Sequence, residues 1–149
     1  MRFEYDLSNA PVMKAVPDGI YLLQAVQSKA KENDKGNTDI MYEFKIVQPD
    51  PCVVDEETVT RIFIHYYINP KDPDQGMGFL RPLFKACGKL VTGTGFDTDD
   101  IVGDIFGAEI VRQEGTPEYP TPKNQIRNYF PQDDMPPVQF KETEGANAA

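Results

Sequence analysis

Residues 61–67 alternate between two kinds of side chain. Arg61, Phe63, His65 and Tyr67 occupy every second position, and isoleucine or tyrosine fills the positions between them. Successive side chains of a β-strand point to opposite faces, so this spacing places the cation and the three rings on one face and the other residues in a core. Such rings stack on bases, at roughly 1–3 kcal/mol per base, while cations bind phosphates. The pattern favours a surface for single-stranded nucleic acid.

Further candidates for this surface come from other segments. Residues 29–37 form a polar, lysine-rich stretch that predicts a hairpin loop, and Lys45 lies on the outward face of the strand that follows. Others belong to the last hairpin and its strand. Each such residue could instead lie under the N-terminal segment or in a homodimer contact, and that alternative stays open. These candidates are Lys29, Lys31, Lys35, Lys45, Tyr119, Lys123, Arg127 and Tyr129.

Residue types that would support catalysis are scarce. The chain has one histidine, His65, and its two cysteines, Cys52 and Cys87, match no metal or redox spacing. The aspartates of residues 97–104 lack the glycine and glutamate of a calcium loop, because Val102 and Ala108 stand at those positions. The glycines form no phosphate-binding motif. We expect a protein without enzymatic activity, metal or cofactor.

The elements that must position the candidates follow from apolar periodicity. Strands are predicted over residues 19–29, 39–47, 58–68, 106–115 and 123–130, and a short helix over 77–90 begins within about a turn of Pro82. Its apolar stripe is Phe79, Leu80, Leu83, Phe84 and Cys87. A single turn capped by Asp97 or Thr98 follows. The order β-β-β-α-β-β predicts an all-β fold with one short helix, a five-stranded OB-fold barrel.

Charge and composition divide the chain into three parts. Residues 1–18 are an N-terminal arm, 19–131 the OB-fold domain, and 132–149 a disordered acidic tail. The net charge of −9 opposes nucleic acid, but the acids concentrate in two loops and the tail. The tail could occupy the basic groove, dock replication or recombination proteins through Asp133, Asp134 and Phe140, or only confer solubility. With no apolar run of membrane-spanning length and no signal peptide, we expect no membrane contact and a cytoplasmic location.

Residues 17–131 resemble a family of phage-encoded OB-fold proteins regarded as single-stranded DNA-binding proteins. The features that carry the resemblance are PDGIYLLQAVQSKAKENDKGN, IMYEFKIV, LRPLFKACG, DDIVGDIFGAEIV and PKNQIRNYFP. The resemblance implies a role in viral replication or recombination in the host cytoplasm. The tail is similar to the acidic tip of bacterial single-stranded DNA-binding proteins, although the chain continues nine residues beyond Phe140; the similar residues are Asp133, Asp134, Met135, Pro136, Pro137 and Phe140.

Three functions remain open from the sequence. The first is sequence-tolerant binding of single-stranded DNA in support of phage DNA replication or recombination. The second is a protein-interaction module, such as an inhibitor of a host enzyme whose acidic surface mimics DNA. The third is a structural component of the virion. Affinity for single strands separates the first from the others.

Overall fold

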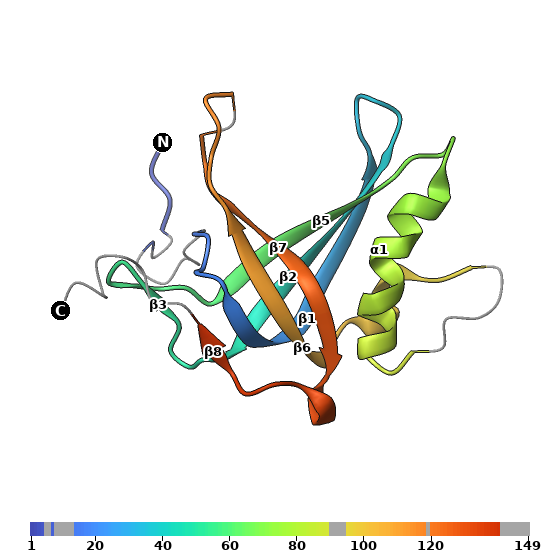
Figure 1. The fold of residues 1–149 in the computed structure, drawn as a ribbon. Helices are drawn as coiled ribbons and strands as arrows, with labels where there is room; N and C mark the ends of the chain where they lie inside the picture. The colour runs from blue at the N-terminus through green and yellow to red at the C-terminus, as the bar shows by residue number, and fades with distance from the viewer. Residues whose placement is uncertain (5–6, 8–13, 90–94, 119, 141–149) are drawn as a thin grey trace.

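The computed structural model describes residues 1–4, 7, 14–89, 95–118 and 120–140, and these are mostly β-structure with one α-helix (Figure 1). Six strands form an open antiparallel sheet in the order β5-β2-β1-β6-β7, with β8 also paired to β1, and β3 and β4 form a separate hairpin. The elements are β1 Gly19–Glu32, β2 Thr38–Gln48, β3 Val53–Val54, β4 Glu57–Thr58, β5 Arg61–Ile68, α1 Pro73–Ala86, η2 Thr98–Ile101, β6 Ile105–Gln113, β7 Lys123–Pro131, η3 Gln132–Asp134 and β8 Gln139–Phe140.

The five expected strands correspond to β1, β2, β5, β6 and β7, and the expected position of the helix between the third and fourth of them is confirmed. The segment expected to be only a link before β5 instead contains the β3–β4 hairpin. Its turn residues, Asp55 and Glu56, both have positive φ angles, 50° and 69°. The expected turn after the helix is the 3₁₀ element η2, whose N-cap is Asp97.

β1 serves both halves of the sheet. Residues Gly19 to Gln24 pair with β6, while Leu22 to Glu32 pair with β2. The β1–β2 ladder shifts register between Leu22 and Leu23 and again between Ala25 and Gln27. Such irregularities bend a strand and increase its twist. They allow one strand to pass from one half of the curled sheet to the other, as Figure 1 shows.

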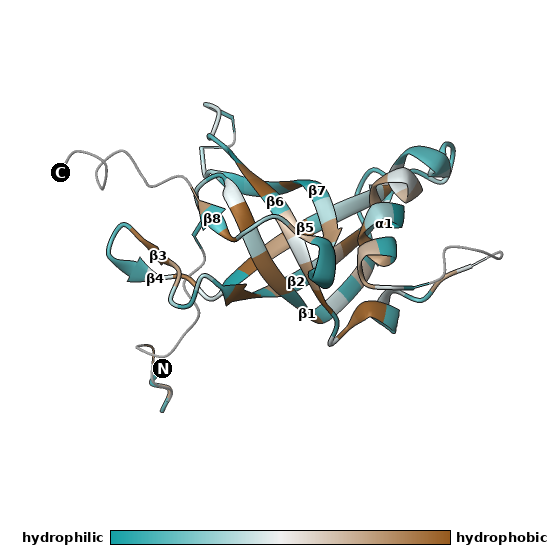
Figure 2. Ribbon diagram, turned by 60° about the horizontal axis from the view of Figure 1, so that its bottom comes forward, coloured by the Kyte–Doolittle hydropathy of each residue, from teal (hydrophilic) through white to brown (hydrophobic). Residues whose placement is uncertain are grey.

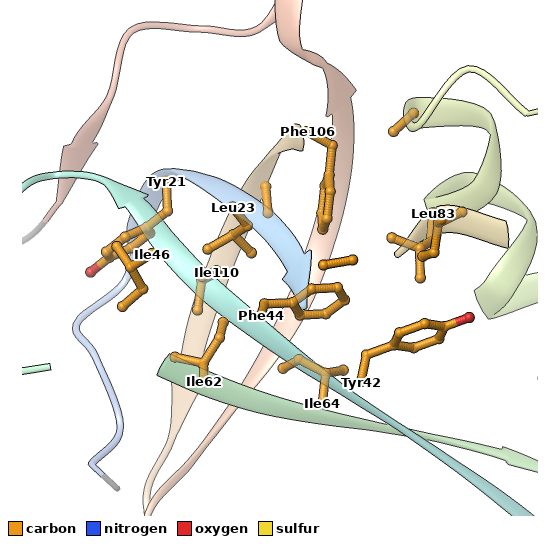
Figure 3. Packing of buried hydrophobic residues seen from close by; sticks show 14 of the residues in the cluster. Tyr21, Leu23, Tyr42, Phe44, Ile46, Ile62, Ile64, Leu83, Phe106 and Ile110 are labelled. Carbon is orange, nitrogen blue, oxygen red and sulfur yellow. The ribbon is translucent and has the colours of Figure 1, made fainter. Parts of the chain in front are cut away.

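The inner face of the sheet carries an aromatic and aliphatic core. Phe44 and Phe106 meet edge to face with ring centroids 5.2 Å apart, and Tyr42 stacks on Phe44 at 5.6 Å. Leu83 of α1 points toward the same cluster (Figure 3). Hydrophobic residues concentrate along β1, β2 and β6, whereas the hairpin turns are hydrophilic (Figure 2). Burial of these side chains, each contributing roughly 1.5–3 kcal/mol, holds the sheet in its curled form.

Helix α1 begins at Pro73 rather than at residue 77, so the prediction that Pro82 lies near its start is wrong. Pro82 cannot donate to the carbonyl of Gly78, but both residues are exposed, and water can satisfy that carbonyl. Of the expected apolar stripe, Phe79 is 61% exposed and belongs to the outer side. The core-facing members are Leu80, Leu83 and Phe84.

The helix lies where the two edge strands of the sheet, β5 and β7, approach each other. A Cβ on Gly76 would lie 2.3 Å from the Tyr67 carbonyl oxygen, so only glycine lets α1 pack this closely on β5. On the inner side, the hydroxyl groups of Tyr66 in β5 and Tyr129 in β7 form a hydrogen bond. Side chains thus join the edges of the sheet across the gap between them.

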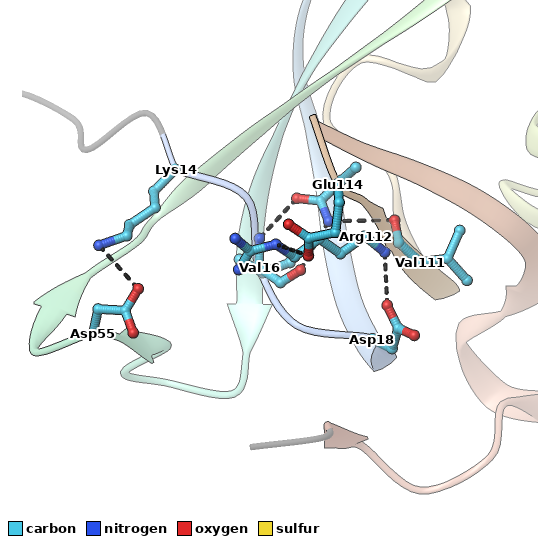
Figure 4. A network of polar contacts seen from close by, with 8 residues as sticks. Lys14, Val16, Asp18, Asp55, Val111, Arg112 and Glu114 are labelled. Atoms are coloured by element: carbon cyan, nitrogen blue, oxygen red, sulfur yellow. Dashed lines mark hydrogen bonds and ion pairs between the residues drawn. The ribbon is translucent and has the colours of Figure 1, made fainter. Parts of the chain in front are cut away.

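Part of the N-terminal arm is fixed to the sheet (Figure 4). The backbone N–H of Val16 donates to Asn124 Oδ1 at 2.8 Å, and the Asn124 amide donates back to the Val16 carbonyl at 2.9 Å. Asp18 accepts from the backbone N–H of Arg112 at 2.7 Å. Lys14 lies 3.3 Å from Asp55 of the β3–β4 turn. Residues 14–18 therefore close the end of the sheet formed by β6 and β7.

Residues 132–140 are not a disordered tail, and this part of the expected domain division is wrong. β8 pairs with Gly19 and Ile20 of β1, and Phe140 stacks on the buried ring of Tyr21 at 6.1 Å. Met135 packs on Gly107, where a Cβ would lie 2.9 Å from it. We call residues 132–140 the C-terminal strap. Residues 141–149, the remainder of the expected tail, lie outside the described residues.

The strap explains why β1 is apolar on both faces. Tyr21 and Leu23 point into the main core, whereas Ile20 and Leu22 point to the opposite side yet are only 8% and 7% exposed. Leu22 lies directly opposite Gly107, the residue covered by Met135. The apolar content of both faces reflects this second packing layer.

Among the described residues, α1 and the shorter helical turns are too short or too polar to span a membrane.

Candidate nucleic-acid interface

The register of three neighbouring strands brings most of the candidates onto one face. Residues directly opposite each other in antiparallel strands share a face. Along β2 and β5, Lys45 lies opposite Arg61, Glu43 opposite Phe63, Met41 opposite His65 and Asp39 opposite Tyr67. We call this outer side of β1, β2 and β5 the three-strand face.

β1 extends the same rows. Lys31 lies opposite Asp39, Lys29 opposite Met41, Gln27 opposite Glu43 and Gln24 opposite Lys45. The face therefore has an aromatic column on β5, a mixed polar column on β2 and a lysine-bearing column on β1. The candidates that it unites are Lys29, Lys31, Lys45, Arg61, Phe63, His65 and Tyr67.

Burial confirms which side faces outward. Ile62, Ile64 and Tyr66 are at most 5% exposed, as core residues should be. Between them, His65 and Tyr67 are exposed, and Tyr67 retains 53% of its surface. Lys29, Lys31 and Lys45 are also exposed. His65, Tyr67 and the lysines of the three-strand face are accessible to a ligand, and Phe63 is partly exposed.

Two carboxylates, Glu43 and Asp39, reduce the net positive charge of this face. Glu43 Oε2 lies 3.3 Å from Arg61 Nε, with the two side chains 21% and 27% exposed. Arg61 is consequently a half-buried, paired cation rather than a free one, although its Nη1 has no hydrogen-bond partner among the described residues. Asp39 is the second carboxylate. With four cations against these two acids, the face remains positive in a chain of net charge −9.

Asp39, His65 and Tyr67 form a connected group. His65 Nδ1 lies 2.9 Å from Asp39 Oδ1, and the His65 ring is parallel to that of Tyr67, with centroids 6.0 Å apart and planes inclined by 10°. Partial burial, with the nearby Asp39 charge, raises the pKa of Tyr67. Its hydroxyl is therefore neutral at physiological pH. Asp39 was not among the expected site residues, although its position in the alternation of β2 places it on the same face as Met41 and Lys45.

The two hairpins that frame the sheet project from the same end of it, at the top of Figure 1. Lys35 is exposed in the β1–β2 loop, where Asn33 Oδ1 accepts from the backbone N–H of Lys35 and of Asn37 at 3.0 Å. The β6–β7 hairpin ends at Lys123, which is also exposed. A hollow of about 840 Å³ in that hairpin is lined by Glu114 and Glu118 as well as Lys123, so it does not favour phosphate.

The remaining candidates lie elsewhere. Tyr129 points inward: it packs 6.0 Å from Phe106 and bonds to Tyr66, so its expected place in the groove is wrong. The β6–β7 register explains this: Glu109 pairs with Asn128 and the next residue of β6, Ile110, pairs with Ile126, so Arg127 is the extra residue of a β-bulge. The extra residue reverses the alternation and turns Tyr129 into the core. Arg127 itself is exposed on β7. Tyr119 lies outside the described residues.

The three expected docking residues are in the strap. Asp133 and Asp134 are exposed in η3, whereas Phe140 is partly buried against Tyr21. Phe140 is therefore not a free docking side chain, because it already packs within its own chain. The strap pairs with Gly19 and Ile20 at the start of β1. Lys29 and Lys31 of the three-strand face lie near the other end of that strand, so β8 is not paired beside them.

Thiols and phenols inside the fold are held in their neutral forms. Burial raises the pKa of Cys52 to about 11 and that of Cys87 to about 12. The pKa of Tyr129 is about 12 for the same reason. A thiol nucleophile must be deprotonated, so neither cysteine is activated. In the part of the chain that the structure describes, no group of three metal-ligating side chains is close enough to hold an ion.

No protein-family model matches the chain, and no curated protein matches its sequence. What the three-strand face can bind has to be argued from its own chemistry. It offers three rings in a row on β5 and lysines on β2 and β1.

Proposed function

We propose that this chain binds single-stranded DNA without strong sequence preference, on the three-strand face of an OB-fold barrel. The observation that carries the proposal is the register, which places Phe63, His65 and Tyr67 of β5 on the same outer surface as Lys29 and Lys31 of β1, with β2 between them. Alternate residues of a strand are roughly 7 Å apart, so the three rings can meet successive unstacked bases. Lysines beside them can reach the phosphates.

The topology supports the OB-fold assignment. In five-stranded OB barrels the oligonucleotide lies on the second and third strands, between the first and fourth hairpin loops. Here those strands correspond to β2 and β5, and the loops to the β1–β2 and β6–β7 hairpins. The bond between Tyr66 and Tyr129, together with α1, joins β5 to β7 as closure of a barrel requires.

The chemistry of the face favours single strands over duplex. In a duplex the faces of the bases are stacked on one another and cannot reach protein rings, whereas every base of a single strand presents one. Stacking also discriminates little between bases, which accounts for the proposed sequence tolerance. A role in phage DNA replication or recombination is part of the proposal and follows from the resemblance of residues 17–131.

The test is a titration of fluorescently labelled oligonucleotides followed by anisotropy. A 30-nucleotide dT strand should bind more tightly than the matching duplex. With about four phosphate contacts, a log–log salt slope near −3 is expected, or roughly a 50-fold loss of affinity between 50 and 200 mM salt. Tyr67→Ala should weaken binding by about 5- to 150-fold through the loss of one stacking contact.

Lys85→Ala provides a matched control for the charge variants Lys29→Ala and Lys31→Ala. Lys85 is an exposed lysine on α1, outside the three-strand face. It should leave affinity unchanged, whereas each face variant should lower it and reduce the salt slope by about 0.7. Absence of binding at 50 mM salt, or equal affinity for duplex, would refute the proposal.

The alternative is a protein-interaction module whose acidic surface mimics DNA. It rests on the consecutive acids Asp55, Glu56 and Glu57 at the β3–β4 turn, which are exposed. Lys14 already neutralises part of that cluster, since it lies 3.3 Å from both Asp55 and Glu57. The same titration decides between the two, because an acidic mimic has no affinity for DNA.

A further inference from the structure

A buried carboxylate lies on the face proposed to bind a polyanion. Asp39 is only 7% exposed and is the one charged residue among the described positions that reaches that degree of burial. It stands between Lys31 of β1 and Tyr67 of β5. Burial of a carboxylate is costly, and a negative charge here opposes phosphate. A polar or apolar residue would avoid both costs, so the carboxylate calls for a specific explanation.

The contacts of Asp39 supply that explanation. Its Oδ1 lies 2.9 Å from Nδ1 of His65. An ionised carboxylate can only accept a hydrogen bond, so the His65 proton sits on Nδ1 and Nε2 faces away from Asp39. The same bond fixes the rotation of the ring, which lies nearly parallel to the Tyr67 ring. His65 is 44% exposed, so a ring without this bond would be free to turn.

We propose that Asp39 is a positioning residue: it holds His65 parallel to Tyr67, so that the His65 ring is already in its orientation for stacking on a base before DNA binds. The inference rests on the proposed function. Holding a side chain in its bound orientation removes an ordering cost from the binding step. The carboxylate is shielded from a ligand by its burial.

Three variants separate positioning from simple repulsion. Asp39→Asn removes the charge but keeps an oxygen that can accept from Nδ1. Asp39→Ala removes both the charge and the acceptor. Glu43→Gln is the matched control, because it removes a carboxylate from the same face without touching the His65 contact. Circular dichroism and thermal unfolding would establish that each variant is folded.

If Asp39 positions His65, the dT titration should show Asp39→Asn binding as tightly as wild type or more tightly. Asp39→Ala should bind about three- to tenfold more weakly than Asp39→Asn, the range expected for one side chain that must be ordered on binding. Glu43→Gln should strengthen binding modestly.

A spectroscopic readout tests the positioning without DNA. His65 is the only histidine in the chain, so its imidazole ¹⁵N signals are unambiguous. At pH 8, wild type and Asp39→Asn should carry the proton on Nδ1, and Asp39→Ala should shift it toward Nε2.

Two results would overturn the inference while leaving the proposed function intact: an unchanged tautomer in Asp39→Ala, or equal strengthening by Asp39→Ala, Asp39→Asn and Glu43→Gln. The latter would show that Asp39 acts only as a repelling charge. Failure of the wild-type protein to bind dT would instead remove the proposed function, and the inference with it.

Discussion

Gly19→Ala tests whether the C-terminal strap is an integral part of the fold. A Cβ at this position would lie 2.4 Å from both the Gln139 carbonyl oxygen and the Phe140 Cα. Both contacts are to backbone, so a rotamer change cannot relieve them, and β8 must move away from β1. Overpacking of this kind costs about 1–3 kcal/mol, and we expect that loss in the free energy of unfolding.

The same substitution should have the opposite sign in a chain truncated after Pro131. Removing the strap removes the three atoms that lie nearest to this Cβ, and replacing glycine by alanine then stabilises a strand by about 0.4–1 kcal/mol through the unfolded state. Urea unfolding of the four proteins, with and without the substitution and the strap, gives the coupling directly. An equal cost of Gly19→Ala in the full-length and truncated chains would show that the strap does not pack on β1.

Three further predictions concern the hydrogen-bonded pair Tyr66 and Tyr129 and the two cysteine thiols. Tyr66→Phe and Tyr129→Phe should each lower the free energy of unfolding in urea by about 1–3 kcal/mol, because each leaves a buried hydroxyl unpaired. The double variant should lose less than the sum of the two; additive losses would refute the pairing. The pKa of Tyr129 is about 12 in the folded state and near 10 in the unfolded state, so its contribution to the free energy of unfolding is complete below about pH 10 and is lost as pH rises toward 12. In Tyr129→Phe, the free energy of unfolding should therefore depend less on pH between 10 and 12; an unchanged pH dependence would contradict this. The thiols of Cys52 and Cys87, with pKa values of about 11 and 12, should react slowly with a thiol reagent at pH 8 because little of either is ionised. Immediate modification of both in the native protein would contradict these raised pKa values.

The strands could be predicted because their patterns depend on local periodicity. Tyr42, Phe44 and Ile46 alternate with the charged residues Glu43 and Lys45, and the structure places all three on the buried side of β2. The face of Phe63, His65 and Tyr67 followed from the same rule on β5. Where the alternation is unbroken, side-chain direction can be inferred without knowledge of the partner strand.

The errors arise where a distant contact overrides the local pattern. The bulge at Arg127 depends on pairing with β6 and reverses the direction of Tyr129. The order of residues 132–140 depends on packing against β1, where Gly19 pairs with Phe140, about 120 residues later in the chain. A signal for the strap was present, since Ile20 and Leu22 made β1 apolar on both faces, but periodicity alone does not say which segment covers them.

Chemical-shift mapping with a short dT oligonucleotide tests the central claim most directly. On titration of the ¹⁵N-labelled protein with 12-nucleotide dT, the largest changes should fall on residues 61–67 of β5, with a second group at Lys29 and Lys31 of β1. The amides of α1 and of the β3–β4 hairpin should change little. Changes centred on the acidic turn at Asp55, or no changes at all at 50 mM salt, would contradict the assignment of the three-strand face as a DNA-binding surface.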